Sequence, residues 1–133
     1  FFPGAAIAPI STYNGIQYEV HILIHRAPVS GHWWLLVQGE AVGYWPSDLF
    51  TSLKDGADMV EWGGEVFNQN VGRHTKTGMG SGHYAGQGYG RACFVRNMTV
   101  LVGLKLLDPN LNIIAEKPAC YSGRLSPSRY FYF

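Results

Sequence analysis

The chain has 133 residues, of which 47% are apolar and 14% charged, a composition typical of one folded domain rather than a disordered tail. Ten Lys and Arg residues balance nine Asp and Glu residues, and a net charge of +1 excludes the strongly basic surface of a nucleic-acid-binding arm. No apolar run approaches the roughly 20 residues of a membrane-spanning helix. We therefore expect a single domain over residues 1–133, with no nucleic-acid partner and no membrane partner.

The composition also predicts an all-β fold with one short helix. Seventeen glycines and 14% aromatic residues favour strands joined by tight turns, whereas helices favour Ala, Leu, Glu and Lys. The start at Phe1 shows no initiator Met and no secretion signal, and the chain stops in the aromatic run Tyr130–Phe133. We interpret both ends as cut from a longer protein.

Two strands and a hairpin are expected first along the chain. Apolar and polar residues alternate over Ile16–Ile24, the period of a strand with one buried face. His32–Gln38 is an unbroken apolar run, which indicates a strand covered on both faces. Pro28 and Gly31 between the two strands predict a hairpin connection.

The expected helix covers Trp45–Leu53. Pro46 suits a first helical turn and Asp48 favours the positive end of the helix dipole, while Asp55-Gly56 ends the segment. Further strands are predicted at Met59–Phe67, at Cys93–Leu106 as one long strand or two, and at Leu111–Ala115.

Two motifs in the glycine-rich stretch Gly78–Gly90 are weak. Gly80–Ala85 fits the pattern GxGxxA, but no helical pattern follows that would receive a pyrophosphate. Ser81 has a glycine on either side, whereas a nucleophile elbow needs glycines two residues away. The stretch is better explained as a loop or bulged strand that allows close backbone approach.

No metal or cofactor is predicted. His21 and His25 lie about 13 Å apart on a regular strand, too far to bind one ion directly. His74 and His83 flank a predicted turn and could converge, but no Cys or carboxylate set stands at metal-ligand spacing.

The sequence leaves open whether the two cysteines are bonded and whether its one sequon carries a glycan. Cys93 and Cys120 could form one bridge, or could be two thiols whose partners lie outside this chain. Asn97-Met98-Thr99 is an N-glycosylation sequon that matters only in a secreted protein.

Two glutamates lie within the apolar segment Met59–Phe67, where a carboxylate is costly to bury unless it is paired or protonated. The neighbouring pair Gly63-Gly64 leaves room for a ligand or a second backbone. Glu61 and Glu65 share one face of a regular strand about 13 Å apart, so they cannot share a proton unless the two glycines between them form a strong bulge. Either one glutamate is catalytic with a partner from another strand, or both simply point to water.

The sequence resembles the neprosin family over nearly its whole length and in order. The blocks that carry the resemblance are Ala5–Ser11, Tyr13-Asn14-Gly15, Gly31–Trp34, Gly43–Pro46, Leu49-Phe50, Glu61–Val66, His74-Thr75, Met79–His83 and Arg96-Asn97. The resemblance implies a secreted, largely plant protein with an antiparallel β-sandwich fold. It also implies a glutamic endopeptidase that cleaves peptides after proline and needs no cofactor.

The implied mechanism uses two glutamates, one activating water and the other, protonated, polarising the scissile carbonyl. By motif position Glu65 matches one of them, and Glu61 is the weaker candidate. The chain resembles the C-terminal portion of the sandwich, and no residue in it corresponds to the second glutamate. An upstream segment or a companion chain would have to supply that glutamate. The family also implies a partner for Cys120 beyond Phe133 and a small residue other than cysteine at position 93.

Two functions are therefore weighed for this chain. In the first, a proline-containing peptide is cleaved in acid, in a cleft that Tyr44, Trp45 and Trp62 would line because aromatic faces pack against the proline ring. In the second, a non-catalytic β-sandwich related to the peptidase, a defence or storage protein, binds carbohydrate or protein at an aromatic surface.

Overall fold

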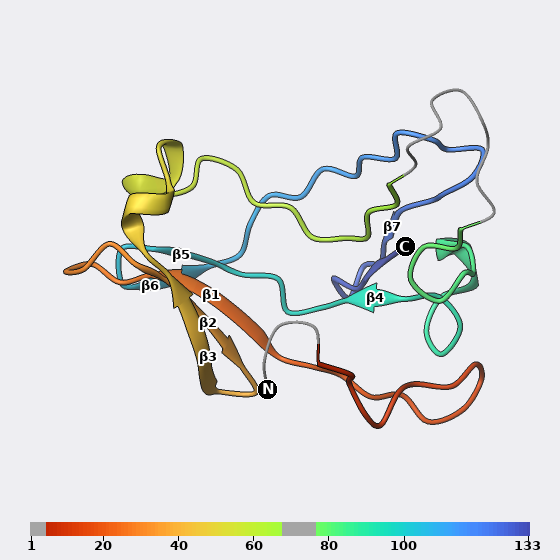
Figure 1. The fold of residues 1–133 in the computed structure, drawn as a ribbon. Coiled ribbons are helices and arrows are strands. Elements are labelled where there is room, and N and C mark those ends of the chain that lie inside the picture. Colours follow the sequence, from red (N-terminus) through yellow and green to blue (C-terminus); the bar gives the residue numbers. More distant parts are fainter. Residues whose placement is uncertain (1–4, 68–76) are drawn as a thin grey trace. The chain divides into compact units, whose positions relative to one another are not determined.

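The structure is a computed structural model that describes residues 5–67 and 77–133. All the strands in these residues pair antiparallel (Figure 1). Contacts divide the chain into two units. The first holds Gln17–Val60 with the segment that ends at Ser11, and the second holds Thr12–Ile16 with Glu61–Phe133. The described residues form no helix longer than a 3-10 turn. The all-β prediction is confirmed, whereas sandwich closure and the single domain stay predictions.

The first unit contains a three-stranded sheet in the order β1-β2-β3. These strands are β1 (Ile22–Arg26), β2 (Trp33–Val37) and β3 (Glu40–Trp45). The predicted hairpin connects β1 to β2, and Gly31 in that connection has φ +71°, a conformation that favours glycine. Every residue of β2 is only half-buried, so the predicted cover on both faces is not present.

The first predicted strand, Ile16–Ile24, is shorter in the structure and begins only at Ile22. Just before β1, the N–H of His21 donates to the side-chain Oε1 of Gln38 at 3.0 Å. A side chain thus takes the place of the backbone carbonyl that would accept this bond in a continued strand pair. The predicted buried face is exposed as well, because Ile22 and Ile24 keep 62% and 53% of their surface accessible. Alternation therefore indicated an apolar face correctly but did not show what covers it.

Strand β3 was not predicted. Gln38 and Gly39 form a two-residue connection in which both φ angles are positive, +54° and +83°, as in the primed turns that join hairpins. Gln-Gly is a weaker signal for this turn than Asn-Gly, which explains why the sequence did not reveal it.

The predicted helix Trp45–Leu53 is wrong. The structure has two 3-10 turns instead, η1 (Ser47–Leu49) and η2 (Ser52–Lys54), with Trp45 as the last residue of β3. An isolated helix of this length is marginal in water, and two of its apolar residues, Leu49 and Leu53, keep 68% and 38% of their surface exposed, so packing does not compensate.

Side chains from the sheet fasten the segment that carries these two turns. The Arg26 guanidinium Nε donates to the carbonyl of Lys54 at 2.7 Å, and the Trp33 indole N–H donates to the carbonyl of Leu53 at 2.9 Å. Both carbonyls would be at the end of the predicted helix, so the sheet satisfies acceptors that a helix end leaves open.

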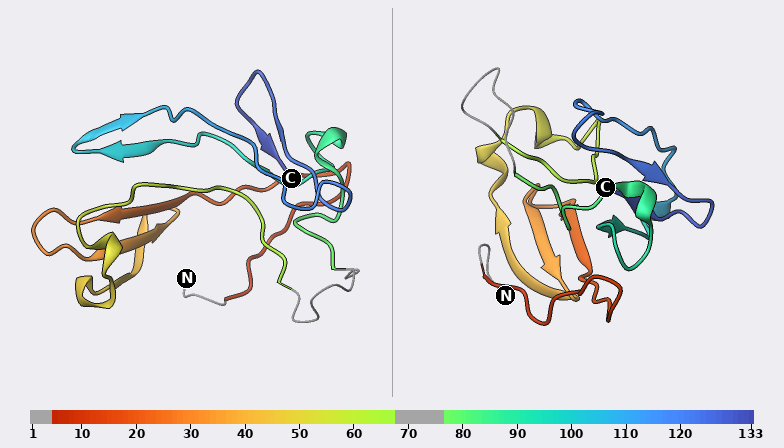
Figure 2. Two further views of the ribbon diagram at one scale, coloured as in Figure 1. Left: turned by 90° about the horizontal axis from the view of Figure 1, so that it is seen from above. Right: turned by 90° about the vertical axis from the view of Figure 1, so that its right-hand side faces the viewer.

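The second unit contains a small sheet and a separate hairpin (Figure 2). The sheet has the order β4-β8-β7, formed by β4 (Phe94–Val95), β8 (Phe131–Tyr132) and β7 (Arg124–Leu125). The hairpin joins β5 (Val100–Val102) to β6 (Lys105–Leu107). A third 3-10 turn, η3, covers Ala85–Gln87 within the glycine-rich stretch.

Three predicted strands of this unit are corrected. Cys93–Leu106 is neither one strand nor two, because positive φ angles at Asn97 (+55°) and Gly103 (+61°) break it into β4 and a hairpin. Leu111–Ala115 forms no strand. Met59–Phe67 is likewise unpaired and bends at Gly63. Contrary to the prediction from the sequence, Glu61 and Glu65 therefore do not lie on one face of a regular strand.

The core of the second unit is small. Ala85 and Ala92 are buried against Tyr132, which is 8% exposed, and Phe94 and Tyr130 pack around this cluster. The Tyr132 ring stacks on Tyr130 with centroids 5.9 Å apart. Aromatic rings thus supply most of the buried apolar surface at β8.

We expect Tyr132→Ala to lower the free energy of unfolding by about 3 kcal/mol, because it removes the largest side chain of this core and leaves a cavity. Leu104→Ala is the matched control, since Leu104 is 92% exposed and its loss should change stability by less than about 0.5 kcal/mol. Urea denaturation of the purified protein measures both, and equal effects would show that this cluster is not the core.

Candidate functional site

Glu65 lies on an extended segment whose glycines rest on two aromatic rings of β8 and its extension. A Cβ on Gly63 would be 3.7 Å from the Phe131 ring, and one on Gly64 would be 3.0 Å from the Phe133 ring. Glu65 itself is exposed and forms no hydrogen bond or ion pair with any described residue. Its carboxylate is therefore accessible, and close backbone packing rather than a side-chain bond positions it.

The block Met79–His83 packs against the same segment. A Cβ on Gly64 would come within 2.6 Å of the Met79 side chain, so a residue other than glycine would require that side chain to move. Gly80 and Gly82 have φ +57° and +76°, and the Gly82 N–H donates to the Met79 carbonyl at 2.9 Å. This tight turn holds Met79 beside the main chain that precedes Glu65.

A cavity of about 240 Å³ lies in the second unit, lined by residues from the segments 77–84 and 119–122 together with Phe133. Two of the polar groups in its wall already have partners. The Tyr121 hydroxyl donates to the Thr77 carbonyl at 3.1 Å, and Ser122 Oγ accepts the N–H of Ala85 at 2.9 Å. Among residues 77–133 and the other described part of the chain, no Asp, Glu, Lys or Arg lines the cavity.

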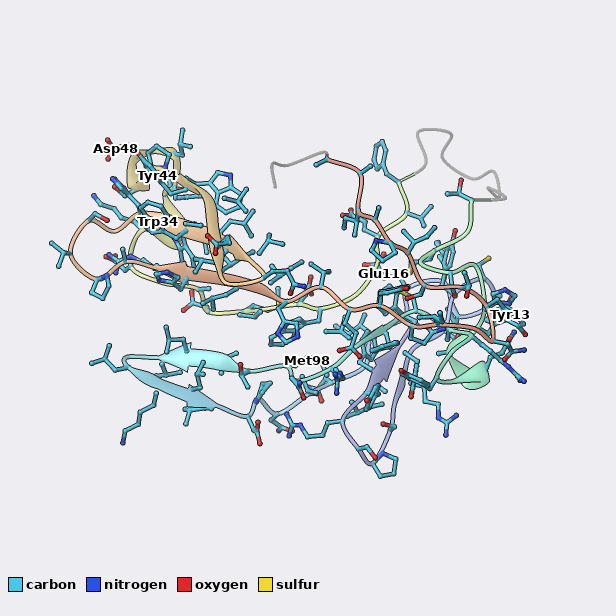
Figure 3. The ribbon with its side chains drawn as sticks, turned by 90° about the horizontal axis from the view of Figure 1, so that it is seen from below. Tyr13, Trp34, Tyr44, Asp48, Met98 and Glu116 are labelled. Atoms are coloured by element: carbon cyan, nitrogen blue, oxygen red, sulfur yellow. The ribbon has the colours of Figure 1, made fainter. Side chains whose placement is uncertain are left out.

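His83, one of the candidate metal ligands, instead packs against Tyr13 with ring centroids 4.5 Å apart. The Tyr13 hydroxyl donates to Gln87 Oε1 at 3.2 Å, and the Arg91 Nε donates to Asn14 Oδ1 at 2.8 Å. Figure 3 labels Tyr13 in this turn. The Tyr13-Asn14-Gly15 turn thus docks on the loop after His83. The sequence identified this turn as one of the family blocks but did not predict the contact.

Among the described residues no three His, Cys, Asp or Glu side chains converge as they would around a metal ion, and His74 lies outside those residues. Cys93 and Cys120 form no disulfide with each other. Burial raises the pKa of the Cys93 thiol, and the hydrogen bond with the Phe94 backbone opposes this rise only in part. No described helix is long and apolar enough to cross a membrane.

The predicted aromatic lining falls in two units. Tyr44 and Trp45 lie on β3 of the first unit, and the half-buried Trp62 lies in the second, so their shared cleft stays a prediction. Within the first unit the Tyr44 ring stacks on His32 with centroids 4.9 Å apart and is tilted against Trp34 at the same distance. Figure 3 shows Trp34 and Tyr44 close together on this sheet. His32 and Trp34 were not predicted as partners of Tyr44.

Sequence reasoning also missed the cavity wall around Tyr121 and Ser122. These residues follow Leu111–Ala115, a segment for which only a short strand was expected, and they lie about 40 residues from the 77–84 segment, as the Thr77 and Ala85 bonds show. No local pattern reports a contact over that separation.

The family described as Neprosin matches residues 1–133, so the match includes the Glu65 segment, the block Met79–His83 and the Tyr13 turn. Because the match spans the whole chain, the chain belongs to the Neprosin family, a membership that indicates a peptidase-related function.

Proposed function

We propose that this chain supplies Glu65 as one catalytic carboxylate of a glutamic endopeptidase that cleaves peptides after proline. The observation that carries the proposal is the position of Glu65: it is exposed, and the preceding Gly64 touches two residues, Met79 and Phe133, of a cavity wall. An accessible carboxylate beside a cavity is where a bound peptide and an attacking water can meet.

In this mechanism one carboxylate acts as general base and removes a proton from the attacking water. The other, protonated, donates a hydrogen bond to the scissile carbonyl and later a proton to the leaving amine. Two neighbouring carboxylates cannot both ionise cheaply, so the pair holds one proton and works best in acid. The second carboxylate is proposed to come from an upstream segment or a companion chain.

Glu65→Gln should lower kcat/KM for a proline-containing peptide at least about 100-fold, because the amide can neither accept the proton from water nor share one. Glu61→Gln is the matched control, because Glu61 is also exposed on the same segment. Cleavage is followed by mass spectrometry across acidic and neutral pH in the natural protein that contains this chain.

The Glu61→Gln protein should keep the wild-type rate within about twofold and the same bell-shaped pH profile. Full activity of the Glu65→Gln protein would contradict the assignment of Glu65 as a catalytic carboxylate. Equal losses of kcat/KM in both variants would indicate a general effect of charge on this segment.

A second candidate function is carbohydrate binding by a non-catalytic sandwich, and the stacked rings of the first unit favour it. Tyr44 keeps 50% of its surface exposed on β3 while it stacks on His32, whose Nδ1 accepts the Ser47 N–H at 3.1 Å. An aromatic face held in this way presents a rigid platform to a sugar ring or a proline.

Tyr44→Ala should weaken oligosaccharide binding at least about tenfold if this second function is correct, because the stacking face is lost. Tryptophan fluorescence titration with an oligosaccharide series measures the affinity, and Tyr18→Ala, an exposed tyrosine of the same unit, is the control. Saccharide binding that Tyr44→Ala leaves intact, or no saccharide binding at all, would exclude the platform as a sugar site.

We further propose that the protein is secreted. Supporting this, Asn97 and Thr99 of the sequon are both exposed and Asn97 lies in a turn with φ +55°, while Met98 between them is 4% exposed. An exposed sequon in a turn is accessible to glycosylation in the secretory pathway.

An N-glycan should therefore be present on Asn97 in protein from its natural source. Intact mass should fall on treatment with an amidase that removes N-glycans, and Asn97→Gln should abolish this shift, whereas Asn112→Gln, outside any sequon, should retain it. An unchanged mass in the wild-type protein would contradict glycosylation at this site.

A further inference from the structure

We propose that the cavity beside Gly64 is a substrate subsite that accepts one uncharged, apolar side chain flanking the proline of the peptide. This proposal rests on the proposed function, because it assigns the cavity to the same peptide substrate that Glu65 would help to cleave.

Position is the first argument. Met79 and Phe133 line the cavity, and both contact the main chain of Gly64, the residue directly before Glu65. An extended peptide advances about 3.3 Å per residue, so a side chain only a few positions from the scissile bond would reach the cavity.

The size of the cavity is the second argument. Its volume of about 240 Å³ is smaller than the roughly 300 Å³ at which pockets for drug-sized ligands begin. A space of this size suits a single side chain rather than a whole small molecule.

The chemistry of the wall is the third argument. Met79 and Phe133 bring apolar side chains to a wall that also contains polar groups, and no Asp, Glu, Lys or Arg among the described residues lines it. The Tyr121 hydroxyl is already hydrogen-bonded within the protein, and the ring of His83 packs on Tyr13. A charged substrate side chain would therefore lose water without gaining a counter-ion from the described lining, whereas an apolar one gains from burial against Met79 and Phe133.

Ala119→Phe provides a direct test, because Ala119 is exposed and lines the cavity, so a larger side chain fills the space without disturbing a core. Ala115→Phe is the matched control: the same substitution, also at an exposed alanine of the second unit, but outside the cavity lining. The substrates are peptides with one proline and with either Leu or Gly at each of the three positions on either side.

Two quantities are measured on the full natural protein: kcat/KM for cleavage, and the affinity of each peptide for the Glu65→Gln protein by calorimetry. At one position Leu should be preferred over Gly at least about tenfold in both measurements. Ala119→Phe should remove this preference, with Gly peptides changed less than about twofold, and Ala115→Phe should keep it.

The cavity assignment is overturned if no position prefers Leu, if Ala119→Phe leaves the preference intact, or if it weakens Leu and Gly peptides alike. A wild-type protein that cleaves no peptide, or a Glu65→Gln protein that cleaves normally, would instead count against the peptidase. If the wild-type protein cleaves no peptide, the affinities of the Leu and Gly peptides still test the cavity proposal. If the Glu65→Gln protein cleaves normally, the kcat/KM values for the same peptides test it.

Discussion

The site region depends on the close approach of glycine backbone to the aromatic rings at the end of the chain. Gly64 and Gly80 both lie against the Phe133 ring, and Gly123 lies 3.2 Å, measured from its ideal Cβ position, from the Phe131 ring. Three segments thus approach the rings of Phe131 and Phe133 closely at positions that have no side chain. Tyr132, the neighbour of both rings in the sequence, is buried in the small core of this unit, so the rings that carry the glycine contacts are anchored to that core.

The predictions from sequence succeeded where a short-range signal determines the structure. The hairpin between β1 and β2 was found because Pro28 and Gly31 act within a few residues of the turn. The helix expected over Trp45–Leu53 was wrong because a helix of this length is marginal on its own, and the structure instead ties two 3-10 turns to the sheet through Arg26 and Trp33, contacts that propensity does not contain. The strand predicted over Met59–Phe67 was wrong for a related reason, because apolar residues form a strand only where a partner strand is present to pair with them.

The candidate site was predictable only in part. Glu65 was singled out by an unusual carboxylate in an apolar segment and by resemblance to a family, and the structure finds it exposed on a glycine-supported backbone. The cavity next to that segment was beyond reach, because its wall brings Tyr121 and Ser122 to residues about 40 positions earlier. Contacts over such separations leave no periodic trace in one sequence.

The turn of Tyr13 and Asn14 has a consequence for the order in which the chain folds. These residues belong to the second unit although the residues on both sides belong to the first, and Asn14 pairs with Arg91, 77 positions later. On the ribosome the turn emerges long before its partners, so the hairpin of β1 and β2 can form while the turn remains undocked. A contact over so long a separation tends to form slowly, because folding rates fall as the sequence separation of contacts rises. We therefore expect the second unit to complete its folding late, with its earliest-synthesised residues among the last to find their place.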